Sequence, residues 1–387
     1  MAPWFTGLTA VSASLANLVP GLGRGLNQTT TSKVRANLLQ AANASWELGT
    51  ATEALLELSY PSLSVFNASA FPPHARLAAP AAPTDVLRIA TTVVTEKPTD
   101  SLPLLPNDGS AADPASIGVA VLVANWTRTN LSDHQYADAA SGQLQYLLDV
   151  VPRSPEGAIS HRNSEVQLWA DFVYMVPPFI AYYGSLQGGQ AGMTNLQAAY
   201  DQCRLYRDAL RDDSGLWRHI TLGSFTDDSH WATGNAWAAA GMLRVLSTMN
   251  HTSAGKQFIG QQANLTEWIN EILVASWEHQ NDDGSLMNVV DDSTSFVDMS
   301  ATALLASVTY RMAVFQKNTS LIEPAIRALG AITQHVDADG WLFNTTDPIT
   351  FHTPLAPGQH SPEGQAFVLL LQSAWQAFSQ FVTKKNT

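Results

Sequence analysis

Cysteine and positive charge are both scarce in this chain of 387 residues. A single cysteine, Cys203, excludes an internal disulfide, so a chain of this length must be stabilised by burial. Cys203 lies in an apolar helical pattern, which predicts a buried thiol. The 20 lysines and arginines stand against 33 aspartates and glutamates, a formal net charge of −13. Nucleic acids and anionic membranes require a basic surface, so we expect neither as a partner.

Long apolar runs and the common cofactor motifs are also missing. No run reaches the ~20 residues of a membrane-spanning helix, which predicts a soluble protein. The sequence contains no G-x-G-x-x-G before a helix, no P-loop and no H-E-x-x-H, so no cofactor and no metal are expected. His352, His360 and Glu363 match no tight metal-ligand spacing. Residues 1–20 are apolar without a basic start, which predicts a weak signal remnant or a strap in residues 1–29, before a single domain over 30–387.

N-glycosylation sequons, by contrast, are abundant. The Ser and Thr content of the chain would give roughly three by chance, whereas nine occur. We therefore expect N-glycans on a secreted, extracellular protein; accidental matches in a Ser/Thr-rich chain are the alternative. The acceptors are Asn27, Asn43, Asn67, Asn125, Asn130, Asn250, Asn264, Asn318 and Asn344. Asn43 is expected to be buried in a helix and to remain unmodified.

A loose internal repeat organises the chain. Turns centred on Gly157, Gly215, Gly284 and Gly340 recur at steps of 58, 69 and 56 residues. Each turn leads through a short loop into an apolar helix, and amphipathic helices lie between these helices. Extended towards the N-terminus, the pattern gives six inner and six outer helices. It predicts an all-α fold, an (α/α)6 barrel in the form of a six-hairpin toroid, with an open helical solenoid as the alternative.

Polar residues gather at the N-terminal ends of the predicted inner helices, which would therefore surround a cleft. Gln167 to Asp171 are predicted to open the third inner helix, where an Asp among apolar neighbours needs a reason to be buried. A helix-capping Asp is the simpler interpretation. The fourth inner helix begins with HWATGNAW, residues 230–237. Aromatic rings beside hydrogen-bonding groups are what a sugar requires, so an oligosaccharide substrate is predicted.

The segment WADFVYMVPPFIAYYG resembles the catalytic segment of the unsaturated rhamnogalacturonyl hydrolases, glycoside hydrolase family 105. That family is related to the unsaturated glucuronyl hydrolases of family 88. Four further stretches fit it in the same order: WELGTATEALLEL, GLWRH, WATGNAW and FVDMSATALL. The resemblance covers residues 30 to 380 and implies a glycosidase on a six-hairpin barrel. It also implies removal of Δ4,5-unsaturated galacturonyl residues from the non-reducing ends of rhamnogalacturonan oligosaccharides, as in pectin degradation.

The resemblance further implies which residues act. Asp171 would be the general acid and base, and Asp113 the second acid, with Asp108 as its alternative. The acid protonates the C4=C5 enol ether, water adds at C5, and the hemiketal collapses to release the sugar. Burial beside Trp169 is expected to raise the pKa of Asp171 towards neutrality. The residues expected to bind substrate are His219, Trp169, Trp231, Thr233, Asn235, Trp237 and Tyr174.

The sequence departs from the family at two positions. Thr233 stands where W-A-R-G-N has an Arg that would suit a substrate carboxylate, and Asp298 stands at a Glu position. Arg218, Arg162 and His230 are candidates to replace that Arg. Two other functions therefore remain open. The chain could be an ordinary exo-glycosidase, such as a uronosidase, acting by paired carboxylates on the same barrel, or a catalytically impaired glycan-binding homologue.

Overall fold

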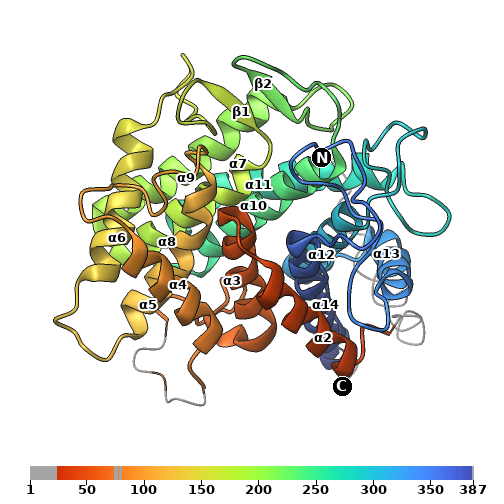
Figure 1. Ribbon diagram of the computed structural model, residues 1–387, viewed down its shortest axis with the longest axis horizontal. Helices are drawn as coiled ribbons and strands as arrows, with labels where there is room; N and C mark the ends of the chain where they lie inside the picture. Colours follow the sequence, from red (N-terminus) through yellow and green to blue (C-terminus); the bar gives the residue numbers. More distant parts are fainter. Residues whose placement is uncertain (1–23, 74–76, 78–80, 386–387) are drawn as a thin grey trace, which may run out of the picture.

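The computed structural model describes residues 24–73, 77 and 81–385, which fold into the predicted (α/α)6 barrel (Figure 1). Six hairpins follow one another around the barrel, each made of an outer and an inner helix. Outer helix first, they are α2 (Gln28–Ala41) with α3 (Ser45–Ser59), α4 (Thr84–Glu96) with α5 (Gly118–Thr127), α6 (Gln135–Gln145) with α7 (Phe172–Met175) and α8 (Pro177–Gln187), α9 (Gly189–Leu210) with α10 (Ala232–His251), α11 (Ile259–Trp277) with α12 (Met299–Gln316), and α13 (Ile322–His335) with α14 (Pro362–Lys385).

Burial distinguishes the two rings. In the inner helix α10 every residue from Ala232 to Met249 is buried, which suits a helix that is apolar nearly all round. In the outer helix α13 the buried residues lie on one face, at Ile322, Ala325, Ala328, Leu329, Ala331 and Ile332. The distinction between apolar inner helices and amphipathic outer helices is therefore confirmed.

The repeat glycines lie in tight turns that follow the outer helices. Gly157, Gly215, Gly284 and Gly340 have φ of 99°, 87°, 92° and 86°, a region that side-chain-bearing residues rarely adopt. At Gly284 a Cβ atom would also lie 2.5 Å from the carbonyl oxygen of Arg327. Glycine therefore recurs in these turns because the backbone conformation there is one that other residues rarely adopt.

The third inner helix differs from the prediction at its start. Gln167–Trp169 form a strand, β1, which pairs antiparallel with β2 (Ile220–Leu222), and the helix begins only at Phe172. A second interruption follows at Pro177 and Pro178, where two residues without an N–H divide α7 from α8. The predicted helical start at Gln167 is therefore wrong, because pairing with β2 satisfies the backbone hydrogen-bonding groups there. Asp171 consequently lies at a strand-to-helix junction.

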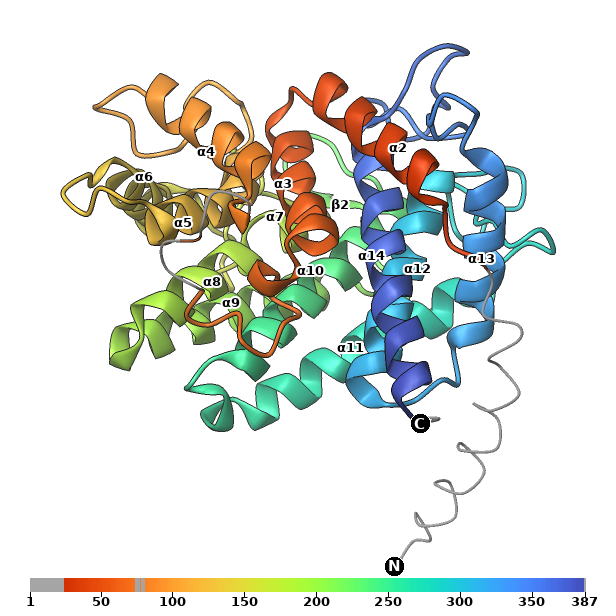
Figure 2. The same ribbon diagram turned by 90° about the horizontal axis from the view of Figure 1, so that it is seen from below.

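The ring closes between the first and last hairpins, where α14 packs against α2 and α3 (Figure 2). Leu26 N–H donates to Gln372 Oε1 at 2.9 Å, and Gln372 Nε2 donates back to Leu26 O at 3.2 Å. Leu26 therefore packs on the barrel, within the segment that the sequence predicted as a signal remnant or strap. Most of the predicted signal remnant, residues 1–23, lies outside the described part of the chain.

The nine sequon asparagines all belong to the described residues. Seven are exposed (Asn27, Asn43, Asn130, Asn250, Asn264, Asn318 and Asn344), and Asn67 and Asn125 are half-buried. The expectation that Asn43 is buried in a helix is wrong, since it lies in the exposed connection between α2 and α3. Among the described helices, none combines the length and apolarity needed to cross a membrane.

Candidate active site

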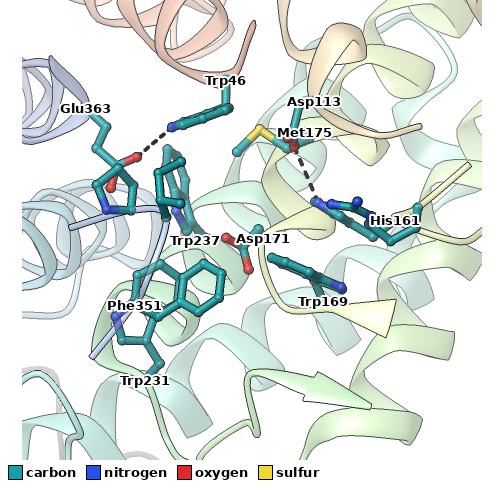
Figure 3. Close-up of a pocket in the computed structure, with 13 residues that line it drawn as sticks. Trp46, Asp113, His161, Trp169, Asp171, Met175, Trp231, Trp237, Phe351 and Glu363 are labelled. Carbon is teal, nitrogen blue, oxygen red and sulfur yellow. Dashed lines mark hydrogen bonds and ion pairs between the residues drawn. The ribbon is translucent and has the colours of Figure 1, made fainter. Parts of the chain in front are cut away.

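A cavity of about 660 Å³ opens where the N-terminal ends of inner helices meet the loops between hairpins (Figure 3). That volume counts the open mouth of the cavity as well as its enclosed part. Aromatic rings and carboxyl groups dominate its wall. The lining residues are Trp46, Asp113, His161, Arg162, Trp169, Asp171, Met175, Trp231, Trp237, Pro348, Ile349, Phe351 and Glu363.

Five of the nine residues predicted to catalyse or to bind substrate line this cavity: Asp113, Trp169, Asp171, Trp231 and Trp237. The other four are not among the lining residues. His219 is fully buried below Asp171, Tyr174 packs on the ring of Trp237 at 4.4 Å, and Thr233 and Asn235 are buried in the first turn of α10. These four residues lie behind the cavity wall, where their side chains position other groups.

Asp171 is held at the junction by the backbone on both sides. Ala170 N–H donates to His219 O at 2.9 Å, which continues the pairing of β1 with the β2 segment. The Asp171 side chain accepts no capping hydrogen bond from α7, so the capping interpretation does not describe it. Its Oδ2 instead lies 3.3 Å from Nε2 of His219, and the side chain is 14% exposed. The carboxylate is thus held on one side by His219 and is open to the cavity on the other.

The pKa of Asp171 shifts in the direction opposite to the one expected from the sequence. Burial raises its pKa, but the hydrogen bond and charge of His219, with a further contribution from His161, outweigh burial and lower the pKa below its ordinary value. The predicted rise towards neutrality is therefore wrong. Burial lowers the pKa of His219, but the interactions of its two ring nitrogens with the carboxylates of Asp171 and Asp227 outweigh it and raise that pKa. Each nitrogen of the imidazole faces a carboxylate, which favours its doubly protonated form.

The pKa of Asp113 shifts the other way. Burial raises its pKa well above the ordinary value, and the charges of Asp108 and Asp171 raise it further. Its Oδ1 lies 3.6 Å from Nε2 of His161, whose pKa burial lowers to about 4, so His161 does not offset this effect. A hydrogen bond with Ser110 and the charge of Arg162 lower the pKa of Asp113 but do not outweigh burial. Asp108, the alternative second acid, is not among the lining residues. Of these two acids, Asp171 is therefore shifted towards the ionised form and Asp113 towards the protonated form.

Sequence reasoning missed several lining residues. His161 stacks on Trp169 with ring centroids 4.7 Å apart, and Trp46 Nε1 donates to Glu363 Oε2 at 2.9 Å. Burial and the charge of Glu47 raise the pKa of Glu363 well above its ordinary value. Trp46 and Glu363 each lie in the first turn of an inner helix. Extending to every hairpin the rule that such positions face the cleft would have found both. His161 and Phe351 lie on loops, where no periodic pattern marks them.

The two departures from the family are in direct contact. Thr233 Oγ1 donates to Asp298 Oδ2 at 2.9 Å, and Asp298 Oδ1 accepts from Ser300 N–H at 2.9 Å to cap α12. Asn235 is also fully engaged, since its side chain bonds both the N–H and the carbonyl of Trp217. The α10 start therefore joins α12 and the preceding turn, and the Thr233 hydroxyl faces Asp298.

One of the three candidate cations lines the cavity. Arg162 lies with its guanidinium carbon 5.9 Å from the centre of the Trp169 ring. His230 lies between Asp212 and Asp291, each at 2.8 Å. Arg218 is 43% exposed and lies 3.9 Å from Asp228. Within the described residues, Arg162 is the permanent positive charge on the cavity wall.

Comparison with known proteins gives a consistent result. The model of Glycosyl Hydrolase Family 88 matches residues 80–355. The unsaturated rhamnogalacturonyl hydrolase YesR of Bacillus subtilis is 24% identical over 266 residues, which are 66% of this chain and 71% of YesR.

Solved structures resemble the whole barrel. A possible member of the GH105 family from Klebsiella pneumoniae superposes with a TM-score of 0.68 at 17% identity, covering 97% of this chain and 95% of that one. The unsaturated glucuronyl hydrolase of Bacillus sp. GL1, responsible for the degradation of glycosaminoglycan, gives 0.61 at 15% identity, with 88% and 94% covered. These structural similarities show the fold.

Proposed function

Because the chain belongs to Glycosyl Hydrolase Family 88, we propose that it removes Δ4,5-unsaturated galacturonyl residues from the non-reducing ends of rhamnogalacturonan oligosaccharides. It is a glycoside hydrolase of the unsaturated uronyl hydrolase type. The choice of sugar rests on its similarity to YesR. We also propose that the protein is secreted and N-glycosylated, which the exposure of most of its sequons supports.

One observation supports this function above the others: two carboxyl groups with opposite pKa shifts line the same cavity. Asp113 is shifted towards the protonated form and Asp171 towards the ionised form. Pairs of this kind divide into an acid and a base. Hydration of an enol ether needs both, since one carbon must gain a proton while water loses one.

The proposed reaction follows from that division. The Asp113 carboxyl gives its proton to C4, and the positive charge that develops at C5 is shared with the ring oxygen. Water adds to C5 from the side of Asp171, which accepts the water proton. The hemiketal at C5 then opens by breaking its bond to the ring oxygen, and the hemiacetal left at C1 releases the sugar. In this scheme Asp171 acts as the base, and the acid role that the resemblance implied for it passes to Asp113.

Arg162 is the proposed partner of the substrate carboxylate. The hydroxyl of Thr233 is already donated to Asp298, and Thr233 does not line the cavity. The guanidinium of Arg162 can offer two parallel hydrogen bonds to a carboxylate and stays charged at every relevant pH. The raised pKa values of Asp113 and Glu363 support the same proposal, because neutral carboxyls do not repel an anionic sugar.

Lyase-digested rhamnogalacturonan provides the direct test. Hydration of the double bond removes its ultraviolet absorbance, so turnover is followed as loss of that absorbance with release of the saturated sugar. Cleavage of saturated uronosides without that loss would instead indicate an ordinary exo-glycosidase. Binding of the oligosaccharides without turnover would indicate the glycan-binding alternative.

A further inference from the structure

A chain of close polar contacts, an ion-pair contact followed by two hydrogen bonds, leads away from Asp171 to a loop of the cavity wall. Oδ2 of Asp171 lies 3.3 Å from His219 Nε2, and His219 Nδ1 lies 2.9 Å from Oδ2 of Asp227. The same Asp227 oxygen lies 2.8 Å from Nε2 of His352. Neither Asp227 nor His352 is among the residues that line the cavity. The chain therefore links the proposed base to a distant loop through residues that need not touch substrate.

The backbone fixes the first part of this chain. Asp227 and Ile220 exchange both backbone hydrogen bonds at 2.9 Å, and His219 N–H donates to Ser229 O at 3.0 Å. Since Ala170 is bonded to His219 in turn, three antiparallel segments place Asp171, His219 and Asp227 in a row. Oδ1 of Asp227 accepts from Ser229 N–H at 3.0 Å. This bond orients the carboxylate and leaves Oδ2 to the two imidazoles.

The loop at the other end is held in a strained shape. Phe351 has φ of 62°, an uncommon conformation for a side-chain-bearing residue, which persists only where the surroundings fix it. Its carbonyl accepts from Asn288 Nδ2 at 3.0 Å and from Thr346 Oγ1 at 2.7 Å. The Phe351 ring lies on the cavity wall, 4.6 Å from the His219 ring. His352, the next residue, fastens this loop to Asp227.

We propose that Asp227 is a positioning residue with two tasks on one oxygen atom: it holds His219 against Asp171, and it fastens the loop that places Phe351 over the substrate. The catalytic relevance of both tasks rests on the proposed function. The arrangement makes the base and one wall of the sugar pocket depend on the same carboxylate. A shift of the loop therefore reaches His219 through two hydrogen bonds, and Asp171 through the 3.3 Å contact beyond them.

The charges around this group are consistent with such a role. Burial raises the pKa of Asp227, but hydrogen bonds from His219 and His352 outweigh it and lower the pKa far below the ordinary value. Without the Asp227 charge, His219 would lose its second proton more readily. Asp171 would then lose the cation that lowers its own pKa. The other groups that influence or are influenced by Asp171 (His161, Asp113, Glu363 and Tyr206) would stay in place.

Two variants separate the two tasks. Asp227→Asn keeps the shape and removes the charge, so kcat should fall by about ten- to a hundredfold, the scale for losing a partner that orients a functional group. The acid limb of the pH profile should move to higher pH. His352→Gln should raise KM by about tenfold, the lower range for a hydrogen bond to a charged group, and leave the pH profile unchanged. Asp228→Asn, with the same charge change at a side chain 75% exposed, is the matched control.

A measurement without substrate distinguishes this proposal from the proposed reaction. Nitrogen-15 NMR of the imidazoles should show His219 doubly protonated at neutral pH in the wild type and singly protonated in Asp227→Asn. An unchanged His219 signal together with an unchanged kcat and pH profile would overturn the first task. An unchanged KM in His352→Gln would overturn the second. If the wild type turns over no unsaturated uronide, the reaction is wrong, and the NMR result still decides whether Asp227 sets the state of His219.

Discussion

At the scale of single residues, protons are distributed unevenly among acids that lie close together. Asp171 and Asp113 share a cavity and are both largely buried, yet their pKa values shift in opposite directions. The difference comes from their neighbours: Asp171 faces a cationic imidazole, while Asp113 faces His161, which stays neutral, and two other acids. Burial alone would have raised both values.

Asp171→Asn should leave the fold intact and reduce turnover by at least about 10²-fold, the scale for losing an acid–base group. The carboxylate makes no capping bond to α7, so its loss does not unfold the helix start. Turnover on unsaturated oligosaccharides and thermal unfolding measure the two effects. Asp201→Asn on α9, a carboxylate on the outer ring, is the control for loss of one negative charge. Turnover at the wild-type rate would show that Asp171 is structural.

The pH dependence of kcat/KM should be bell-shaped. Asp171 must be ionised, and its lowered pKa keeps it so below the ordinary pKa of aspartate, which sets the acid limb. Asp113 must be protonated, and its raised pKa extends activity upward to the alkaline limb. Rate measurements across the acid to neutral range test both limbs. A rate that keeps rising with pH would contradict the assignment of the acid to Asp113.

At the scale of the elements, the starts of α10 and α12 are joined by Thr233 and Asp298. Each is shorter than its counterpart in the family pattern, and the two meet in one hydrogen bond. The two departures from the family pattern therefore fall at one contact between α10 and α12. The sequence alone presented them as separate departures.

Thr233→Arg should accordingly fail to improve substrate binding. The longer side chain would enter a fully packed position, at a cost of about 1–3 kcal/mol for overpacking, and Asp298 would bind its charge. In the double variant that also carries Asp298→Glu, the loss of unfolding free energy should differ from the sum of the two single losses, because residues in contact couple energetically. Urea unfolding and substrate affinity of the single and double variants test this. Tighter binding by Thr233→Arg alone would show that the position does face the sugar.

Gly241 sets how closely α10 approaches the segment after Asp171. A Cβ atom there would lie 2.0 Å from the carbonyl oxygen of Val173, so Gly241→Ala must push the two helices apart. We expect a loss of about 1–3 kcal/mol in unfolding free energy and reduced turnover. Gly330→Ala, in α13 with no atom within 4 Å of the added Cβ, should instead stabilise by about 0.5–1 kcal/mol. Equal effects of the two changes would contradict this account.

The elements also show where sequence reasoning succeeded and where it failed. Helical periodicity identified every hairpin, because apolar and amphipathic helices differ over many residues. It assigned Gln167–Trp169 to a helix, because a three-residue strand has no periodicity of its own and depends on a partner some 50 residues away in the chain. The loop residues His161, Asp227 and Phe351 were missed for the same reason. Their roles come from tertiary contacts.

At the scale of the whole molecule, the sequons provide a test of the proposed secretion. Mass spectrometry of protein from a eukaryotic host should show N-glycans at the exposed loop positions Asn130, Asn318 and Asn344. Asn264 should be less occupied, because it lies in α11 and its amide donates to Tyr200 Oη at 2.6 Å. Protein made without glycosylation provides the mass reference. Absence of glycans at every site would remove the support for secretion.

The closure of the ring by α14 also has a consequence for how the protein is made. The last helix supplies Glu363 to the cavity and Gln372 to the seam with Leu26, so both ends of the chain must be present before either is complete. A ribosome delivers Pro362–Lys385 after the other inner helices have emerged with one apolar flank uncovered. The nascent barrel therefore remains an open arc until α14 has emerged. Its risk of aggregation is concentrated in that interval.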